Sequence, residues 1–326
     1  MNLDEVMHTR WLPPPSVEPW RRWIDVFTAA AGVRYRAVAR GEERAGAVQT
    51  TVGLRARLKL DRNGHYSVHT GTGSGRGFLS GWDSTGLGAG QPAYRIAMRE
   101  LFASIRPAPA VQIEVGGLYL SRGESTEATT YDNNGYIVGE RLVIGSAARY
   151  AISLTRAYLG DLENPDVIPR LRRLDRANYL QAQLTTRPAR RVMLSADYTR
   201  HLDSDVLRAA MVLDSVPTRV VDRIRFENYL RLHPTRAYGY AAMAQQRLSP
   251  RLSVGLGMSQ IDSGFGGLNS DRYATGRRVF ASFSFEARPG WIVSSQFIRA
   301  LGGTFTGPQT RVEIGVAYDA LKAMKH

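Results

Sequence analysis

Along most of the chain, apolar side chains alternate with polar or charged ones. In the segment 52–60, which reads VGLRARLKL, every second residue is apolar, and Arg55, Arg57 and Lys59 stand between them. Because successive side chains of a β-strand point to opposite faces, this period of two predicts a strand with one apolar and one charged face. The same alternation returns at 34–36, 111–115, 192–198, 252–258 and 311–318. Such segments are about ten residues long, the length that a tilted strand needs to cross a bilayer.

The alternation predicts about sixteen strands joined by two kinds of link. The expected strands are 32–41, 46–60, 65–72, 93–106, 111–122, 136–145, 148–159, 178–187, 191–202, 205–216, 220–232, 236–248, 251–262, 277–287, 291–301 and 310–319. Short links rich in Pro, Arg and Gly are found at 106–109, 187–190, 249–251 and 288–290. Longer polar or Gly-rich links are expected at 73–92, 123–136, 160–177, 263–277 and 302–309. An even number of strands places both chain ends on the side of the short turns, and the long links then fall on the other side.

The charged face decides between a soluble barrel and a membrane barrel. A soluble barrel or sandwich needs a dry core, and burying many unpaired arginines in such a core is prohibitive. A barrel of about sixteen strands encloses a water-filled lumen that hydrates them, and its apolar face then contacts lipid. We therefore predict an all-β fold, a closed antiparallel transmembrane β-barrel with short periplasmic turns and longer outer loops. The expected organisation is a Pro-rich periplasmic segment at 1–30, the barrel at 31–319 and a C-terminal tail at 320–326.

The composition narrows the choice of partner. The 326 residues include 43 Lys and Arg against 29 Asp and Glu, a formal net charge of +14, and no cysteine. The absence of cysteine excludes disulfides, thiolate metal sites and a cysteine nucleophile. The basic excess favours an anionic partner, such as nucleic acid, a lipid headgroup or an acidic solute. Arginines that are spread over many strands do not form the basic patch with stacking aromatics of a nucleic-acid site, so no nucleic-acid partner is expected.

The layout of strands, short turns and long links, with segments such as 249–257 (SPRLSVGLG), resembles the porin-like outer-membrane barrels of Gram-negative bacteria over about residues 30–319. It is also similar to the C-terminal barrels of exopolysaccharide exporters of the cellulose and poly-N-acetylglucosamine type. The resemblance implies an outer-membrane location, contact with lipid and lipopolysaccharide, and either a homo-oligomer such as a trimer or a periplasmic partner. Two features depart from it. No secretory signal is visible in residues 1–23, and a tail follows Tyr318, where such barrels usually finish on an aromatic residue.

Charged side chains on the face away from lipid are the candidate functional residues. The side chains expected to line the pore are Arg34, Arg36, Arg55, Arg57, Lys59, Arg95, Arg99, Glu114, Arg223, Arg225, Glu227, Arg311 and Glu313. Rows of Arg and Lys in a pore favour anions, whereas pairing with neighbouring carboxylates leaves weak selectivity, and both interpretations stay open. Arg95 and Arg99 share one face of the fourth strand, which places Glu100 on the lipid side unless a bulge or a position at the end of the strand intervenes.

The glycine-rich stretch 71–77 (GTGSGRG) has the look of a phosphate-binding loop. No Lys-Ser or Lys-Thr follows it, however, and no helical period begins there. It instead opens the longest Gly-rich link, 73–92. Two interpretations remain for this link. It folds inward as a constriction, with Arg76, Trp82 and Asp83 at the narrowest point, or it is an outer loop.

Aromatic residues are expected at the two lipid interfaces of the barrel. The candidates are Tyr35, Tyr119, Tyr150, Tyr198, Trp291 and Tyr318.

Two stretches that contain histidine keep an enzyme in consideration. They hold His65, Ser67 and His69 in one segment and Asp197, His201, Asp203 and Ser204 in the other. A hydrolase needs a nucleophile, a base and an orienting group within hydrogen-bond reach. Because the six histidines of the chain produce such coincidences easily, we expect no catalytic residue, no metal site and no cofactor.

The sequence thus predicts an outer-membrane channel for passive passage of small hydrophilic solutes, with anions preferred. The alternatives are an export conduit for an anionic exopolysaccharide, a barrel hydrolase, and a structural scaffold with a blocked lumen.

Overall fold

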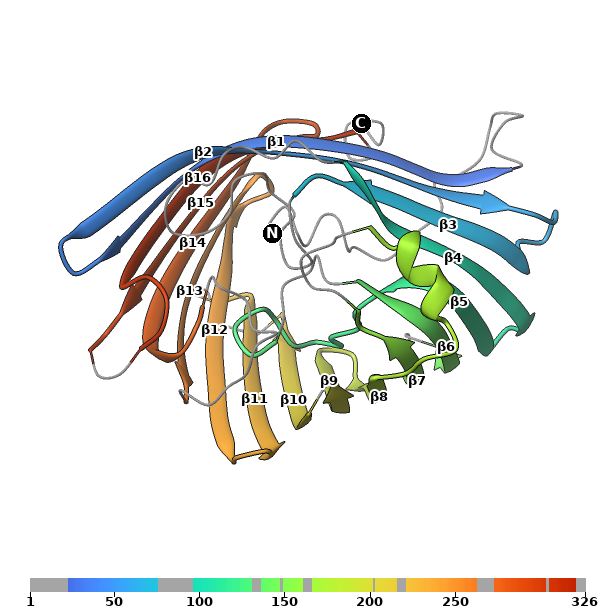
Figure 1. Ribbon diagram of the computed structural model, residues 1–326. Helices are drawn as coiled ribbons and strands as arrows, with labels where there is room; N and C mark the ends of the chain where they lie inside the picture. Colours follow the sequence, from blue (N-terminus) through green and yellow to red (C-terminus); the bar gives the residue numbers. More distant parts are fainter. Residues whose placement is uncertain are drawn as a thin grey trace.

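In the computed structural model the chain forms one closed antiparallel β-barrel (Figure 1). The structure describes residues 23–75, 96–130, 136–146, 149–160, 166–201, 203–215, 221–262, 273–302 and 305–320. The strands are β1 (Ile24–Arg40), β2 (Glu43–Lys59), β3 (Tyr66–Gly73), β4 (Ala97–Ala108), β5 (Val111–Tyr119), β6 (Tyr136–Ser146), β7 (Tyr150–Tyr158), β8 (Tyr179–Ala189), β9 (Val192–His201), β10 (Ser204–Asp214), β11 (Arg223–His233), β12 (Ala237–Ser249), β13 (Leu252–Ile261), β14 (Gly276–Arg288), β15 (Trp291–Ala300) and β16 (Thr310–Asp319). The predicted all-β, sixteen-stranded antiparallel barrel is confirmed.

Each strand pairs with the next along the chain, and β1 closes the barrel against β16, where Val33 lies opposite Val316. β1 begins at Ile24, well before residue 32, where the sequence pattern placed the first strand. Its early residues pair with the far end of β2, with Phe27 opposite Ala56. The sequence pattern missed this extension because the small residues around 29–32 show no alternation, and the pairing partner lies elsewhere in the chain.

The links between strands divide the barrel into two unlike rims. We call the rim at which β1 begins and β16 ends the terminal rim, and the opposite one the loop rim. The links at the terminal rim are 60–65, 109–110, 147–149, 190–191, 215–222, 250–251 and 289–290. The links at the loop rim are 41–42, 74–96, 120–135, 159–178, 202–203, 234–236, 262–275 and 301–309. The five longest links all lie at the loop rim, as the alternation of short and long links predicted.

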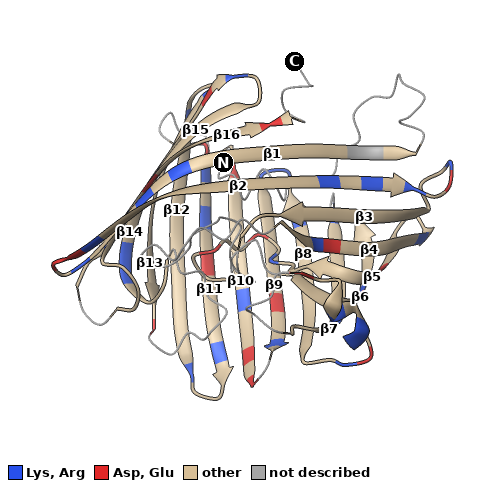
Figure 2. Cartoon of the chain, turned by 45° about the horizontal axis from the view of Figure 1, so that its top comes forward, with Lys and Arg blue, Asp and Glu red and all other residues tan. Residues whose placement is uncertain are grey.

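The barrel is apolar outside and polar inside, the reverse of a soluble core. On β1, Val33 and Tyr35 are about half exposed, whereas Arg34 and Arg36 are 7% and 4% exposed. On β2, exposed Leu54 precedes buried Arg55 in the same way. Charged residues of both signs lie on many strands and on the links between them (Figure 2). An outward row of aliphatic side chains around an inward row of charges is the arrangement of a barrel that faces lipid. None of the helical residues in the described ranges forms a helix long and apolar enough to span a membrane.

Aromatic side chains lie on the outer face near both rims. Tyr150 and Trp291 are about half exposed at the terminal rim, and the Trp291 ring lies 5.2 Å from that of Tyr318. Tyr35 and Tyr198 are exposed nearer the loop rim. The sequence-based assignment of Tyr119 to the lipid interface is wrong. Its ring lies 4.7 Å below the Arg141 guanidinium, and it lines the internal cavity, because the chain leaves β5 at this residue and turns inward.

A β-bulge in β4 accounts for the two adjacent charges at its start. Gly71 of β3 pairs with Glu100 and Thr72 pairs with Met98, so Arg99 is the extra residue. A bulge lets neighbouring side chains avoid opposite faces, and both Arg99 and Glu100 are buried here, at 2% and 3% exposure. Because of the bulge, the Glu100 side chain is buried and does not face the lipid, where strict alternation would have placed it.

Gly71 and Gly73 of the glycine-rich stretch lie on β3, next to the two buried charges of β4. A Cβ on Gly73 would lie 2.9 Å from Cδ of Arg99, and one on Gly71 would lie 3.2 Å from the Glu100 carboxylate. The missing side chains on β3 therefore give room to the two charges on β4. This part of the glycine-rich stretch belongs to a strand, not to a phosphate-binding loop.

The turn between β2 and β3 is organised by one carboxylate. Asp61 accepts hydrogen bonds from the backbone N–H of Tyr66 at 2.8 Å and of Asn63 at 3.3 Å. The Tyr66 bond is the main reason why the pKa of Asp61 lies below its usual value. A lowered carboxyl pKa stabilises the folded turn above the pKa of the unfolded chain, and this contribution is lost as the pH falls through the folded value.

Candidate functional site

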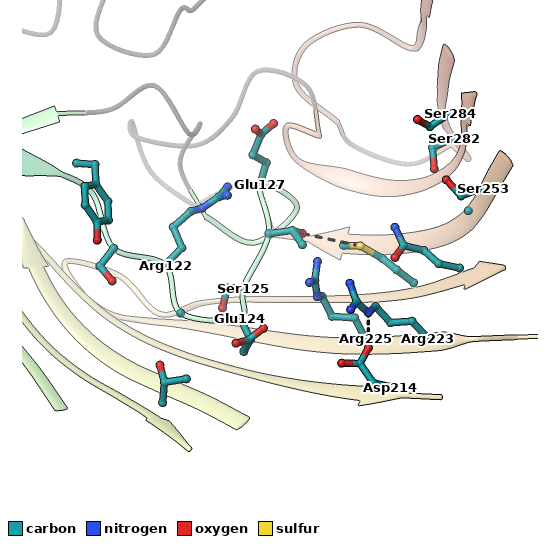
Figure 3. Close-up of a pocket in the computed structure, with 18 of the residues that line it drawn as sticks. Arg122, Glu124, Ser125, Glu127, Asp214, Arg223, Arg225, Ser253, Ser282 and Ser284 are labelled. Atoms are coloured by element: carbon teal, nitrogen blue, oxygen red, sulfur yellow. Dashed lines mark hydrogen bonds and ion pairs between the residues drawn. The ribbon is translucent and has the colours of Figure 1, made fainter. Parts of the chain in front are cut away.

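The interior of the barrel holds a cavity of about 1950 Å³ (Figure 3). Of the side chains that the sequence placed in the pore, those on its wall are Arg34, Arg55, Arg57, Glu114, Arg223, Arg225 and Glu313. Others lie elsewhere on the inner face or at its ends, namely Arg36, Lys59, Arg99, Glu227 and Arg311. Arg95 and the three constriction candidates Arg76, Trp82 and Asp83 lie outside the described residues.

One buried carboxylate, Glu313, is shared by two arginines of β1 and β16. Glu313 accepts from Arg311 at 2.7 Å and forms an ion pair with Arg34 at 3.2 Å. Arg34 also donates from Nε to the Gln49 side-chain oxygen at 2.7 Å. With their donors directed at protein oxygens, these arginines contribute little to attracting a solute, and the pairing alternative applies to this row.

Two further buried ion pairs connect β2 with β4 and β5 with β6. Arg55 contacts Glu100 at 3.0 Å, and Arg141 contacts Glu114 at 3.2 Å. Arg141 also donates to the backbone carbonyl of Tyr119 at 2.5 Å, at the point where the chain leaves β5. Removing one partner of such a pair leaves an uncompensated buried charge, so these residues stabilise the wall and fix the direction in which the following link departs.

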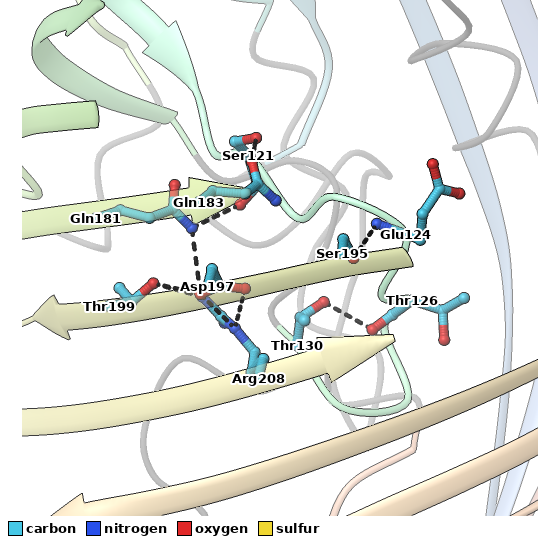
Figure 4. Close-up of polar contacts among 10 residues, drawn as sticks. All are labelled: Ser121, Glu124, Thr126, Thr130, Gln181, Gln183, Ser195, Asp197, Thr199 and Arg208. Carbon is cyan, nitrogen blue, oxygen red and sulfur yellow. Dashed lines mark hydrogen bonds and ion pairs between the residues drawn. The ribbon is translucent and has the colours of Figure 1, made fainter. Parts of the chain in front are cut away.

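The wall of β8–β10 contains a buried carboxylate, Asp197, with several hydrogen-bond donors around it (Figure 4). Asp197 accepts from Arg208 Nη2 at 2.7 Å and from Nε at 3.0 Å, and from the Thr199 hydroxyl at 2.7 Å. Both charged side chains are nearly fully buried, at 3% and 2% exposure. The sequence did not single out Arg208, because its partner lies on the neighbouring strand.

The enzyme candidates are not arranged as a catalytic triad in the described part of the chain. Asp197 is bound to Arg208, and no described residue hydrogen-bonds to Nδ1 of His201. The Ser67 hydroxyl lies 3.2 Å from Nε2 of His69, but Ser67 is only 2% exposed, so a substrate cannot reach its oxygen. No group of three His, Cys, Asp or Glu side chains that could hold a metal ion occurs among the described residues.

Residues 120–130, which follow β5, turn into the barrel, and we call them the inward segment. The Gln181 side chain donates to the carbonyl of Ser121 at 2.9 Å, and the backbone N–H of Glu124 donates to the Ser195 hydroxyl at 2.8 Å (Figure 4). Further along, the Thr129 hydroxyl donates to Glu227 at 2.6 Å. These partners lie on the inner faces of β8, β9 and β11, so the segment follows the opposite wall.

Two further features fix the inward segment. Ala128 is buried in a small apolar cluster with Ala241, Tyr273, Phe280 and Ile298 from the far wall. Gly123 has a positive φ of 59°, and a Cβ there would lie 2.5 Å from the Gln183 amide and 2.7 Å from Ser195 Cβ. Only glycine allows this approach. The sequence pattern predicts an outer link at 123–136, and the run of small hydroxyl residues at 125–130 (STEATT) is the one local feature that accompanies the inward turn.

Some arginines on the cavity wall have no partner within the described part of the chain. The guanidinium groups of five lining arginines have no hydrogen-bond or ion-pair partner among the described residues; they are Arg122, Arg190, Arg225, Arg247 and Arg251. Nη1 of Arg122 and Nε of Arg225 are moreover buried without a hydrogen-bond partner in this set. By contrast, Arg223 is held by Asp214 at 2.5 Å (Figure 3). The unpaired charge in the cavity is therefore mainly positive, although the carboxylate of Glu124 also lies there.

Comparison with known proteins gives a match in structure alone. No protein-family model and no curated protein matches the sequence. A triple mutant of the porin of Rhodopseudomonas blastica superposes with a TM-score of 0.59 at 12% identity, covering 90% of this chain and 99% of the porin. Salmonella typhi OmpF in complex with daunomycin superposes with a TM-score of 0.60 at 10% identity, covering 90% of this chain and 97% of OmpF. At such low identity the likeness concerns the fold, and the chain is a porin-like β-barrel of sixteen antiparallel strands.

Proposed function

We propose that this protein is a channel of the bacterial outer membrane through which small hydrophilic solutes diffuse, with anions preferred. The observation that carries the proposal is the internal cavity of about 1950 Å³, lined by charged and hydroxyl side chains inside a barrel whose outer face is apolar. A polar, hydrated interior lowers the cost of moving a polar solute past the hydrocarbon of the bilayer. The porin-like fold supports the same function by analogy.

The preference for anions rests on the unpaired arginines. Arg34 forms an ion pair with Glu313, whereas Arg122 and Arg225 line the cavity and their guanidinium groups have no counter-charge among the described residues. Unpaired cations that line a pore raise the local concentration of anions. The proposal includes contact of the outer face with lipid and lipopolysaccharide, and it leaves assembly with further copies of the chain or with a periplasmic partner to direct measurement.

The first expected result concerns conduction. The refolded protein, inserted in a planar bilayer, should give steady current steps, and a salt gradient should give a reversal potential of the sign for anion selectivity. A unit charge about 8 Å from an ion in water contributes roughly 0.5 kcal/mol. The double variant Arg122→Gln, Arg225→Gln should therefore lower the anion-to-cation permeability ratio by about two- to fivefold after screening.

The matched control removes a charge away from the cavity. Arg176→Gln changes an exposed arginine of the link between β7 and β8, which does not line the cavity, and should leave the reversal potential unchanged. A wild-type protein that prefers cations, or a double variant with wild-type selectivity, would contradict the role of Arg122 and Arg225. A folded and inserted protein that carries no current would instead favour a closed export conduit, an enzyme or a scaffold.

A further inference from the structure

One stretch of the cavity wall presents a row of hydroxyl and amide groups on four neighbouring strands. It lies on the inner faces of β12, β13, β14 and β15, towards the terminal rim. Strand pairing aligns one row of side chains there, Arg247, Ser253, Ser284 and Ser294. A second row beside it consists of Gln245, Gly255, Ser282 and Gln296. We call these eight residues the polar grid, and all eight line the cavity.

Most groups of the polar grid are available to a solute, whereas the Gln296 amide donates to the Tyr273 hydroxyl at 2.9 Å. The hydroxyls of Ser253, Ser282, Ser284 and Ser294 have no hydrogen-bond partner among the described residues. They are partly or fully exposed to the cavity, and Figure 3 shows three of them along its edge. Arg247 donates its backbone N–H to Asp222, but its guanidinium has no described partner. The grid is thus a patch of donors and acceptors with Arg247 at its end, a cation whose guanidinium has no partner in the ranges that the structure describes.

The spacing of the grid suits a solute with several hydroxyl groups. Side chains directly opposite each other on paired strands lie about 4.5–5.5 Å apart. The row from Arg247 to Ser294 therefore spans roughly 15 Å, since neighbouring strands are about 4.8 Å apart. Gly255 keeps the second row open, because a Cβ there would lie 2.6 Å from the Ser282 hydroxyl.

The chemistry of these groups distinguishes between classes of anion. Serine hydroxyls and glutamine amides both donate and accept hydrogen bonds, and sugar hydroxyls do the same. A small inorganic anion such as phosphate is too short to reach from Arg247 along the whole row, which spans roughly 15 Å. A sugar-like anion can place its carboxylate or phosphate on Arg247 and its hydroxyls along Ser253, Ser284 and Ser294.

From this arrangement we propose that the polar grid binds hydroxylated organic anions, such as phosphorylated or acidic sugars, in preference to inorganic anions. The inference rests on the proposed function, since it names the class of solute that the channel passes best.

The test is calorimetric titration of the folded protein in detergent with glucose 6-phosphate, inorganic phosphate and glucose. Glucose 6-phosphate should bind at least about fivefold more tightly than phosphate, because each added hydrogen bond contributes on the order of 1 kcal/mol. Glucose, which lacks the charge, should bind more weakly than glucose 6-phosphate. Arg247→Gln should weaken the binding of both phosphate compounds.

The decisive variant removes the three hydroxyls of the first row. In Ser253→Ala, Ser284→Ala, Ser294→Ala, the affinity for glucose 6-phosphate should fall to that for phosphate. The matched control Ser146→Ala, Ser153→Ala, Thr185→Ala removes three hydroxyls from another part of the cavity wall and should bind as the wild type does. If the triple variant does not fold, the single change Ser284→Ala should give a smaller loss in the same direction.

Two results would overturn the inference. They are equal affinity of the wild-type protein for glucose 6-phosphate and phosphate, and an equal loss in the control and grid variants. Calorimetry needs no ion flow, so it separates this proposal from the channel itself. A protein that conducts anions without preferring glucose 6-phosphate contradicts the grid alone, whereas one that binds glucose 6-phosphate but carries no current contradicts the channel.

Discussion

Replacing Asp197 by asparagine is expected to lower the free energy of unfolding of the barrel by about 3 kcal/mol, because the change leaves a buried guanidinium without a counter-charge. Asp197 accepts from two nitrogens of Arg208 and from Thr199, and the two charged side chains are almost fully buried. Urea unfolding of the protein in lipid vesicles, followed by tryptophan fluorescence, measures the effect.

A second substitution tests whether the loss comes from the unpaired charge. In Asp197→Asn, Arg208→Met the buried cation is gone, and much of the lost stability should return, because an apolar side chain of similar length fills its place. The control is Arg200→Met. It breaks the exposed contact of Arg200 with Asp205, 3.8 Å long, and should cost no more than about 1 kcal/mol. Equal losses in Asp197→Asn and Arg200→Met would show that burial of the pair does not determine its contribution.

The variant Gly123→Ala is expected to displace the inward segment and to raise the current through the barrel. A Cβ at this position meets the Gln183 amide at 2.5 Å and Ser195 at 2.7 Å, next to the bond between Glu124 and Ser195. The positive φ adds about 1–2 kcal/mol of backbone strain for any residue with a Cβ. Since the segment lies inside the barrel, losing this attachment should widen the path and make the current noisier, as single-channel recording measures.

Gly41 supplies a control with the same backbone strain and no collision. Its φ is 60°, and a Cβ there would meet nothing within 4 Å. Gly41→Ala should therefore lose a similar amount of stability to strain while conducting as the wild type does. If Gly123→Ala and Gly41→Ala conduct alike, the inward segment does not limit the current.

Strand pairing explains why the individual partners of the buried charges were not predictable. Arg55 and Glu100 both face the interior, but they meet only because the bulge at Arg99 shifts the register of β4 against β3. A bulge depends on how two strands pair, and neither strand's own pattern records it. Arg208 lies directly opposite Asp197 on the neighbouring strand. The pattern of either strand alone does not identify this partner.

The choice of link that turns inward was likewise beyond the sequence pattern. Glycine content made 73–92 the candidate for an inward constriction, and residues 76–95 lie outside the described part of the chain; residues 120–130, which the sequence did not single out, turn into the barrel. That choice depends on distant partners, such as Ser195 for Glu124 and Glu227 for Thr129, which lie 71 and 98 positions further along the chain. The polar grid arises similarly, because its serines gather in a row only when β13, β14 and β15 pair in register.

The sequence by itself determined that this chain is a barrel of about sixteen strands, apolar outside and charged inside, with its long links at one rim. These properties follow from a period of two and from strand length, which are local and can be read within each segment. Only the tertiary structure decided which arginines are neutralised, which remain free, which link enters the lumen and where the hydroxyls gather. The physical reason is that all four depend on register and on contacts between residues far apart in the chain, and a register shift of one residue exchanges the two faces of a strand.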